Sequence, residues 1–433
     1  MRIGRTLPPA ATAIGLRDVI SGIRGIFLNQ KERDRFQSEL KEHFGVRHCF
    51  LVSSGKAAFT LILLALKELL PDRDEVLIPA FTCYSVPSSV VRAGLRIRLC
   101  DQRADNFDFD FAQMSATLFE GHRPLVDDRP AGGASRPPLD CRVAADSSGS
   151  SVNQVLAIVP THLFGYPADV TGLRKLIRDP RITIVEDAAQ AMGETIEEGN
   201  IGTLGDVSFF SLARGKAFSV VEGGVILTNR DDIALILNRF VSRLPGYGLL
   251  SILKLILMAA ALMMLTHPRL FWLPRNMPFL KLGETLFETH FPILKMSSFQ
   301  AGLARHWRGK LERLRNERKK NVNRWIAILE AGSNHGSNCR RGQSLGLLRF
   351  PLRISNTKKR ETLLKESARM GLGVMPVYPT SINVIPELRG KIERGNFPVA
   401  ESYARELVTL PTHGYVTDND AMKLTRLISR ALG

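Results

Sequence analysis

Short apolar runs alternate along this chain with longer amphipathic segments. Strands are predicted at His48–Ser53, Glu75–Pro79, Leu95–Cys100, Val155–Val159, Thr183–Val185, Val207–Leu212 and Gly224–Thr228. Helices are predicted between them at Lys56–Leu70, Tyr84–Ala93 and around Asp169–Arg178. Strands that alternate with helices form βαβ units. The pattern therefore predicts an α/β fold, in which helices flank a mostly parallel central sheet and a smaller C-terminal α/β domain follows.

Two segments interrupt this alternation. Residues 120–151 are rich in Pro, Gly, Ser and Asp, which is typical of a long surface loop or a flexible insertion. Residues 249–265 read LLSILKLILMAAALMML and carry one charge, Lys254. A long helix, basic on its exposed face, is expected from Ser297 to Glu330. We divide the chain into a large domain (1–245), an apolar and basic insertion (246–295), and a long helix with the small domain (296–433).

The net charge of +17 is concentrated in one stretch. Residues 239–325 hold 16 basic and four acidic side chains, so they account for +12 of it. Such an excess suggests an anionic partner, but no nucleic-acid-binding motif is recognisable and we expect no nucleic acid. The five cysteines are widely separated without a CxxC pair, which argues against disulfides and a zinc site and favours the cytoplasm. No cleaved signal peptide is expected, because Pro8 and Pro9 interrupt the apolar region.

The apolar segment 249–265 allows two interpretations. It falls short of the ~20 residues that span a bilayer, and a single crossing would separate Lys216 from the small domain. One interpretation is a re-entrant or interfacial element in contact with the membrane surface through 249–282. Its headgroup-level residues would be Arg243, Arg269, Trp272, Arg275 and Lys281. The other is a helical hairpin packed in a dimer interface or against the protein's own surface.

Three motifs carry candidate chemistry. In ITIVEDAAQAMG (182–193), a buried strand ends at Asp187, on the side of an α/β sheet where ligands bind, although such an Asp can also simply cap a helix. In FFSLARGKAFSVVEGG (209–224), Lys216 lies in a turn between two strands, where it is a candidate Schiff-base lysine. Ser54-Gly55-Lys56 precedes a helix whose free N–H groups can bind phosphate. A lysine, an acid and a phosphate site together are what pyridoxal phosphate requires.

These motifs resemble the DegT/DnrJ/EryC1/StrS family of sugar aminotransferases, which are fold-type-I pyridoxal-phosphate enzymes. The resemblance covers most of residues 35–433. It rests on segments that include SSGKAA (53–58), DEVLIPAFT (74–82), THLFGYPADV (161–170), EDAAQAMG (186–193), GDVSFFSLARGKAFSVVEGG (205–224) and FPVAESYARELVTLPTH (397–413).

The resemblance implies a role for each matching residue. Lys216 would be the cofactor-linked catalytic base, and Asp187 would pair with the pyridine nitrogen. Gln190 would lie near the ring hydroxyl, and Ser54, Gly55, Ser211 and the amides of Lys56 and Ala57 would bind the phosphate. Family dehydratases carry His in place of the lysine, so Lys216 favours transamination.

Several positions depart from the family pattern. Lys56 replaces the usual Thr, and Cys83 stands where an aromatic residue commonly stacks on the ring, so Tyr84 is an alternative. Leu212-Ala213-Arg214 replaces Phe-His-Pro, and Ile293-Leu294-Lys295 replaces an Asn-Tyr-Arg cluster that reaches the partner's phosphate. Tyr378 is a candidate for the sugar site, whereas His162 and His413 are interpreted as structural.

We therefore predict a homodimeric, cytoplasmic aminotransferase that converts a nucleotide-linked keto sugar to an amino sugar for a polysaccharide or glycoconjugate, with glutamate as amino donor and no metal. Two alternatives remain. The first is a membrane-associated enzyme acting on a lipid-linked sugar, and the second is a catalytically idle scaffold in a biosynthetic complex.

Overall fold

The predicted strands assemble into one seven-stranded sheet in the order β1-β9-β8-β5-β4-β2-β3. A computed structural model describes residues 3–119, 154–277, 285–331, 345–390, 392 and 395–432. The strands are β1 (His48–Val52), β2 (Glu75–Pro79), β3 (Arg96–Cys100), β4 (Val155–Ile158), β5 (Thr183–Asp187), β8 (Val207–Ser211) and β9 (Gly224–Thr228). Neighbours from β3 to β8 pair in parallel, whereas β9 is antiparallel to β8 and β1. The predicted mostly parallel α/β sheet is confirmed.

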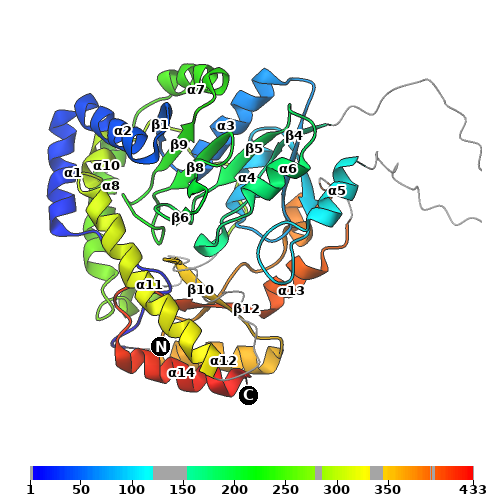
Figure 1. Cartoon of the computed structure of the whole chain (residues 1–433). Helices are drawn as coiled ribbons and strands as arrows, with labels where there is room; N and C mark the ends of the chain where they lie inside the picture. Colours follow the sequence, from blue (N-terminus) through cyan, green and yellow to red (C-terminus); the bar gives the residue numbers. More distant parts are fainter. Residues whose placement is uncertain are drawn as a thin grey trace, which may run out of the picture.

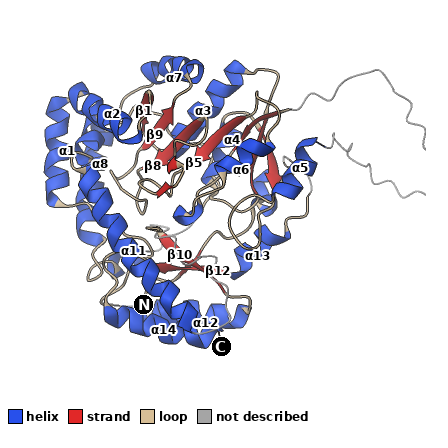
Figure 2. Ribbon diagram, in the orientation of Figure 1, coloured by secondary structure: helices blue, strands red, loops and turns tan. Residues whose placement is uncertain are grey.

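Helices enclose this sheet (Figure 2). They are α1 (Leu16–Leu28), α2 (Gln30–Phe44), α3 (Gly55–Leu69), α4 (Ser85–Arg92), α5 (Phe111–Phe119), α6 (Val170–Leu176) and α7 (Asp231–Arg243). α3 is buried along most of its length, because its apolar residues leave almost no polar face. It packs against β8, β9 and α7, so its amino end lies at the sheet edge where β8 and β5 end.

A smaller sheet, β10-β12-β11, forms the opposite end of the molecule with α12 and α14 (Figure 1). Its strands are β10 (Arg349–Arg353), β11 (Met375–Pro376) and β12 (Leu407–Pro411), and its helices are α12 (Thr357–Met370), α13 (Pro398–Glu406) and α14 (Asp418–Leu432). The N-terminal segment, which we assigned to the large domain, also reaches this end. There the Leu7 amide donates to the Gly371 carbonyl at 2.8 Å.

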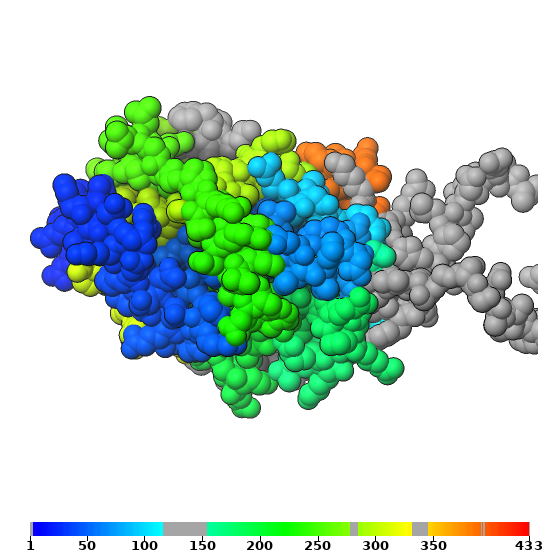
Figure 3. All heavy atoms as spheres, turned by 90° about the horizontal axis from the view of Figure 1, so that it is seen from above, coloured from blue at the N-terminus to red at the C-terminus, as the bar shows by residue number. Residues whose placement is uncertain are grey.

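The long helix expected from Ser297 to Glu330 is two helices, α10 (Ser298–Leu303) and α11 (Trp307–Ala331). Ser297 begins α10, because its hydroxyl accepts from the Gln300 amide at 3.2 Å. α10 is wholly buried against α1, so the N-terminal helices lie beside a segment from the last third of the chain (Figure 3).

The apolar segment forms one helix, α8 (Leu249–Leu265), followed by the short α9 (Trp272–Arg275), rather than a hairpin of two long helices. Leu255 and Ala259 are buried against the protein, whereas Leu249 and Leu250 are 90% and 84% exposed. In the described part of the chain, no helix is long and apolar enough to cross a membrane. The predicted loop at 120–151 lies outside the described residues.

Candidate active site

The buried strand β5 ends at Asp187, as the sequence predicts. The side chain is 4% exposed, and its Oδ1 accepts a hydrogen bond from the Ala189 amide at 3.1 Å. Burial raises the pKa of Asp187, although the nearby Lys216 amine acts in the opposite direction. A cationic group placed beside this carboxylate would offset the cost of its burial.

Lys216 lies in the turn that joins β8 to β9. Gly215 precedes it with φ +70°, a left-handed conformation that favours glycine. The Lys216 carbonyl accepts hydrogen bonds from Thr12 Oγ1 at 2.5 Å and from the Arg318 guanidinium at 3.3 Å. Burial, helped by the charge of Arg349, holds the pKa of the Lys216 amine below its ordinary value. The neutral amine, which is the nucleophile and base, is therefore more populated at neutral pH than in a lysine exposed to solvent.

The amino end of α3 faces the end of β8. Ser54 is its N-cap, and a Cβ at Gly55 would lie 2.9 Å from the Ser211 Cβ, so only glycine allows this approach. The Ser211 hydroxyl makes no hydrogen bond with any described residue and remains available to a ligand. Helix N–H groups beside a free hydroxyl form a site for a phosphate.

These features open onto one cavity of about 310 Å³. Its wall includes most of the predicted site residues: Ser54, Gly55, Lys56, Cys83, Asp187, Gln190, Ser211 and Lys216. The volume lies at the lower end of the roughly 300–1,000 Å³ typical of small-molecule sites. A lysine, a buried acid and a phosphate site around one cavity fit pyridoxal phosphate.

Three predicted residues lie off this wall. The Ala57 amide donates to Ser54 Oγ at 3.1 Å, so that hydrogen bond caps α3. Tyr84 turns toward Thr380, whose amide donates to the Tyr84 hydroxyl at 3.0 Å, and Cys83 lines the cavity instead. Tyr378 lies behind the cavity residue Gln190, whose Nε2 donates to the Tyr378 hydroxyl at 3.3 Å.

The contacts of the Lys56 side chain do not indicate phosphate binding alone. Its Nζ pairs with Glu288 Oε2 at 2.9 Å and lies 4.5 Å from the centre of the Phe291 ring. Lys56 nevertheless lines the cavity.

Both histidines are placed as structural residues. His162 Nε2 bonds Glu186 Oε2 at 3.0 Å, and its Nδ1 accepts from the Ala168 amide at 3.0 Å. His413 Nε2 lies 2.8 Å from the Pro8 carbonyl, and burial lowers its pKa to about 4.

Sequence reasoning missed two kinds of residue. The first lines the cavity without a chemical signature: Phe59, Ser85, Val86, Ser89, Ala189, Phe209, Ala213, Thr285 and Leu286. The second holds the Lys216 turn from elsewhere, as Thr12 and the buried Arg318 do. Nothing local in the sequence shows that an N-terminal threonine and an arginine on α11 meet at this turn.

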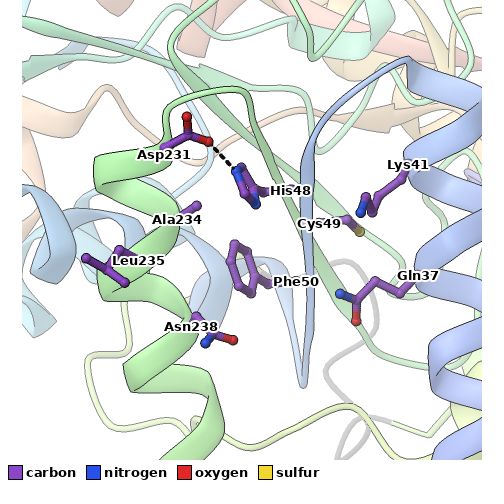
Figure 4. A pocket seen from close by; sticks show the side chains of 9 residues that line it. All are labelled: Gln37, Lys41, His48, Cys49, Phe50, Asp231, Ala234, Leu235 and Asn238. Carbon is purple, nitrogen blue, oxygen red and sulfur yellow. Dashed lines mark hydrogen bonds and ion pairs between the residues drawn. The ribbon is translucent and has the colours of Figure 1, made fainter.

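A separate hollow of about 320 Å³ lies between α2, β1 and α7 (Figure 4). His48 Nε2 bonds Asp231 Oδ1 there at 2.7 Å, and none of the predicted site residues lines it. Among the described residues, no group of three or more His, Cys, Asp or Glu side chains could hold a metal ion.

Comparisons with known proteins show what this chain is similar to. The model of the DegT/DnrJ/EryC1/StrS aminotransferase family matches residues 17–123, 148–246 and 292–429. A GDP-perosamine synthase of Caulobacter vibrioides is 27% identical over 199 residues, which are 46% of this chain and 44% of that protein. The erythromycin biosynthesis sensory transduction protein EryC1 of Saccharopolyspora erythraea is 25% identical over 389 residues, 89% of this chain and 86% of its own.

The fold is shared with solved structures. E. coli GDP-4-keto-6-deoxy-D-mannose-3-dehydratase, solved with bound hydrated PLP, superposes with a TM-score of 0.71. The match covers 98% of this chain and 100% of that chain at 16% identity. At this identity the likeness establishes the fold alone.

Proposed function

Because the chain belongs to the DegT/DnrJ/EryC1/StrS aminotransferase family, we propose that it is a pyridoxal-phosphate-dependent aminotransferase that converts a keto sugar to an amino sugar. The observation that carries this proposal is the convergence of Lys216, Asp187 and the amino end of α3 on one cavity. The same cavity built around His in place of Lys216 would lack an amine to link to the cofactor.

The proposal assigns a task to each of these residues. Bound pyridoxal phosphate supplies the electron sink that allows a proton to leave the amino-bearing carbon. Lys216 anchors the cofactor and moves the proton, which its lowered pKa favours. Asp187 holds a proton on the pyridine nitrogen. The amino end of α3 and Ser211 bind the phosphate, and Gln190 is positioned between the Phe164 amide and the Tyr378 hydroxyl.

The proposed substrate is a nucleotide-linked keto sugar, with glutamate as amino donor. The names of the relatives support this class, since they include GDP-perosamine synthase and dTDP-3-amino-3,4,6-trideoxy-alpha-D-glucose transaminase. The alignment with GDP-perosamine synthase spans less than half of that protein.

Absorbance spectroscopy of the cofactor-loaded protein tests the proposal. Glutamate should bleach the visible absorbance band of the cofactor. A keto-sugar nucleotide that the enzyme accepts as substrate should restore this band. Lys216→Ala should remove this response, because the other lysine on the cavity wall, Lys56, pairs with Glu288 instead. Lys175→Ala, which changes an exposed lysine on α6, is the matched control and should respond like the wild type.

Two results would count against the proposal. Failure of the wild-type protein to bind pyridoxal phosphate would remove the cofactor. A bound cofactor that no amino acid bleaches would favour the alternative of a catalytically idle scaffold.

We also propose a cytoplasmic homodimer. Cys49, Cys83 and Cys100 are free thiols, which suits a reducing compartment. Leu286 lines the cavity and is 58% exposed, so a second copy that covers this rim would bury it.

A further inference from the structure

A second cavity, of about 640 Å³, borders the Lys216 turn. Arg214 and Gly215 line it, whereas Ala213 and Lys216 line the first cavity. The two cavities therefore share the turn that carries the proposed catalytic lysine.

Much of this second cavity is built by residues outside the family match. Its wall includes Pro8, Pro9, Ala10 and Thr12 from the N-terminal segment, and residues between Met258 and Arg275 from α8 and α9. The family model begins its match at residue 17 and leaves out 247–291. Most of the cavity wall thus lies in segments that the family model does not match.

The charge of this cavity is positive and partly uncompensated. Arg214, Arg275 and Arg349 line it, and none of the described residues on its wall is acidic. The guanidinium groups of Arg214 and Arg349 make no hydrogen bond or ion pair with any described residue. Unpaired guanidinium groups beside an apolar wall favour an anion, and their planar geometry matches phosphate oxygens.

The rest of the wall is mostly apolar, from Met258, Ala261, Leu262, Leu265, Phe271, Pro274 and Met375. Leu253 and Leu257, on the same helix α8, are 52% and 61% exposed, so apolar surface continues outside the cavity. Aliphatic walls offer a nucleoside few hydrogen-bonding partners, but they suit a hydrocarbon chain.

We infer that the second cavity binds an isoprenoid diphosphate, so that the enzyme accepts a lipid-linked keto sugar as a further substrate class. The arginines hold the diphosphate, the α8 wall holds the first isoprenoid units, and the sugar extends across the turn to Lys216. The charge of Arg349, which adds to burial in lowering the pKa of Lys216, indicates that the two sites are close. This inference rests on the proposed function, because it assigns the carrier of the same substrate sugar.

Farnesyl diphosphate, used below its micelle-forming concentration, is a direct probe of this site. Calorimetric titration of the cofactor-loaded protein should show at least about tenfold tighter binding than inorganic diphosphate, because the chain buries apolar surface. UDP serves as the nucleotide comparator and should bind more weakly. Arg214→Ala and Ala261→Glu should each weaken farnesyl diphosphate binding by about tenfold or more.

Matched controls lie on the same insertion but off the cavity wall. Arg269→Ala removes an exposed arginine, and Leu250→Asp puts a carboxylate at the exposed amino end of α8. Both should keep the wild-type affinity. Thermal unfolding and circular dichroism establish that each variant is folded before its affinity is compared.

Three results would overturn the inference. In the first, farnesyl diphosphate and inorganic diphosphate bind with equal affinity. In the second, UDP binds as tightly as farnesyl diphosphate, and Ala261→Glu weakens both equally. In the third, both cavity variants keep the wild-type affinity for farnesyl diphosphate. The glutamate-dependent bleaching of the wild-type cofactor is measured separately. Bleaching without farnesyl diphosphate binding would defeat this inference alone, and absence of bleaching would defeat the proposed function.

Discussion

At the scale of single residues, Glu186, which precedes Asp187, holds the end of β5 in place. Glu186 is fully buried, and its two oxygens accept from the amides of Gly202, Leu204 and Gly205 at 3.0, 2.6 and 2.6 Å. Burial alone would raise its pKa, but His162 and these amides outweigh burial and hold the pKa below its ordinary value. Glu186 thereby fixes the end of β5 from which Asp187 enters the cavity.

Glu186→Gln should lower the free energy of unfolding by roughly 2 kcal/mol near neutral pH, because a charged acceptor of several hydrogen bonds is lost. A carboxylate whose pKa is lowered on folding stabilises the protein above its unfolded pKa of about 4.3 and loses that contribution as the pH falls. The difference between wild type and variant should therefore shrink below about pH 4, as measured by urea unfolding from about pH 7 to about pH 2.5.

The control for this series is Glu198→Gln, at an exposed position, which should leave stability unchanged. A wild-type-to-variant difference that stays constant with pH would show that packing, and not the charge, is responsible.

At the scale of elements, glycines decide how α1 and α10 meet. A Cβ at Gly25 would lie 2.5 Å from the Ser298 carbonyl, and one at Gly302 would clash with the Ser21 carbonyl. Only glycine at these positions lets the two backbones come so close. This contact anchors α1, which in turn packs against α8.

Gly302→Ala should destabilise the protein by roughly 1–3 kcal/mol, because the methyl group must push α10 away from α1. Gly309→Ala is the matched change on α11, where a Cβ meets nothing within 4 Å. It should stabilise the helix by up to about 1 kcal/mol. Thermal unfolding of both variants should give shifts of opposite sign, and a stabilising Gly302→Ala would show that the helices can separate without cost.

At the scale of the whole molecule, the basic stretch is less available than its composition suggests. Cations at the end of α10 and along α11 pair with acids far away in the sequence: Arg305 with Glu32, Arg308 with Glu42, Lys310 with Asp18, Arg315 with Glu194 and Arg324 with Asp418. Four of the eight basic side chains of α11 are therefore paired with acids, whereas Arg313, Lys319 and Lys320 make no ion pair with any described residue. The side chains of Arg214 and Arg349, which lie outside this stretch, are unpaired among the described residues and line the second cavity.

The proposed homodimer can be tested at the cavity rim. Leu286→Glu should weaken the dimer by about tenfold or more, because a charge would be buried between the copies. Met422→Glu, which changes a leucine-sized side chain of similar exposure (56%) on α14, is the control and should remain dimeric. Sedimentation across a concentration series distinguishes the outcomes, and a monomeric wild type would contradict the proposal.

The sequence by itself determined the elements and their chemistry. Alternating apolar runs encode the strands locally, so β1, β2 and β5 fall where they were predicted, and the residues around Asp187 and Lys216 carry a recognisable motif. The position of Asp187 at the carboxyl end of a buried strand also follows from periodicity alone.

Only the tertiary structure decided which residues meet. It placed Cys83 and not Tyr84 on the cavity wall, divided the expected long helix into α10 and α11, and brought Thr12 and Arg318 to the carbonyl of Lys216. It also turned the apolar segment into one wall of a second cavity. The physical reason is that these contacts join residues far apart along the chain, whereas hydrophobic periodicity records only the environment of near neighbours.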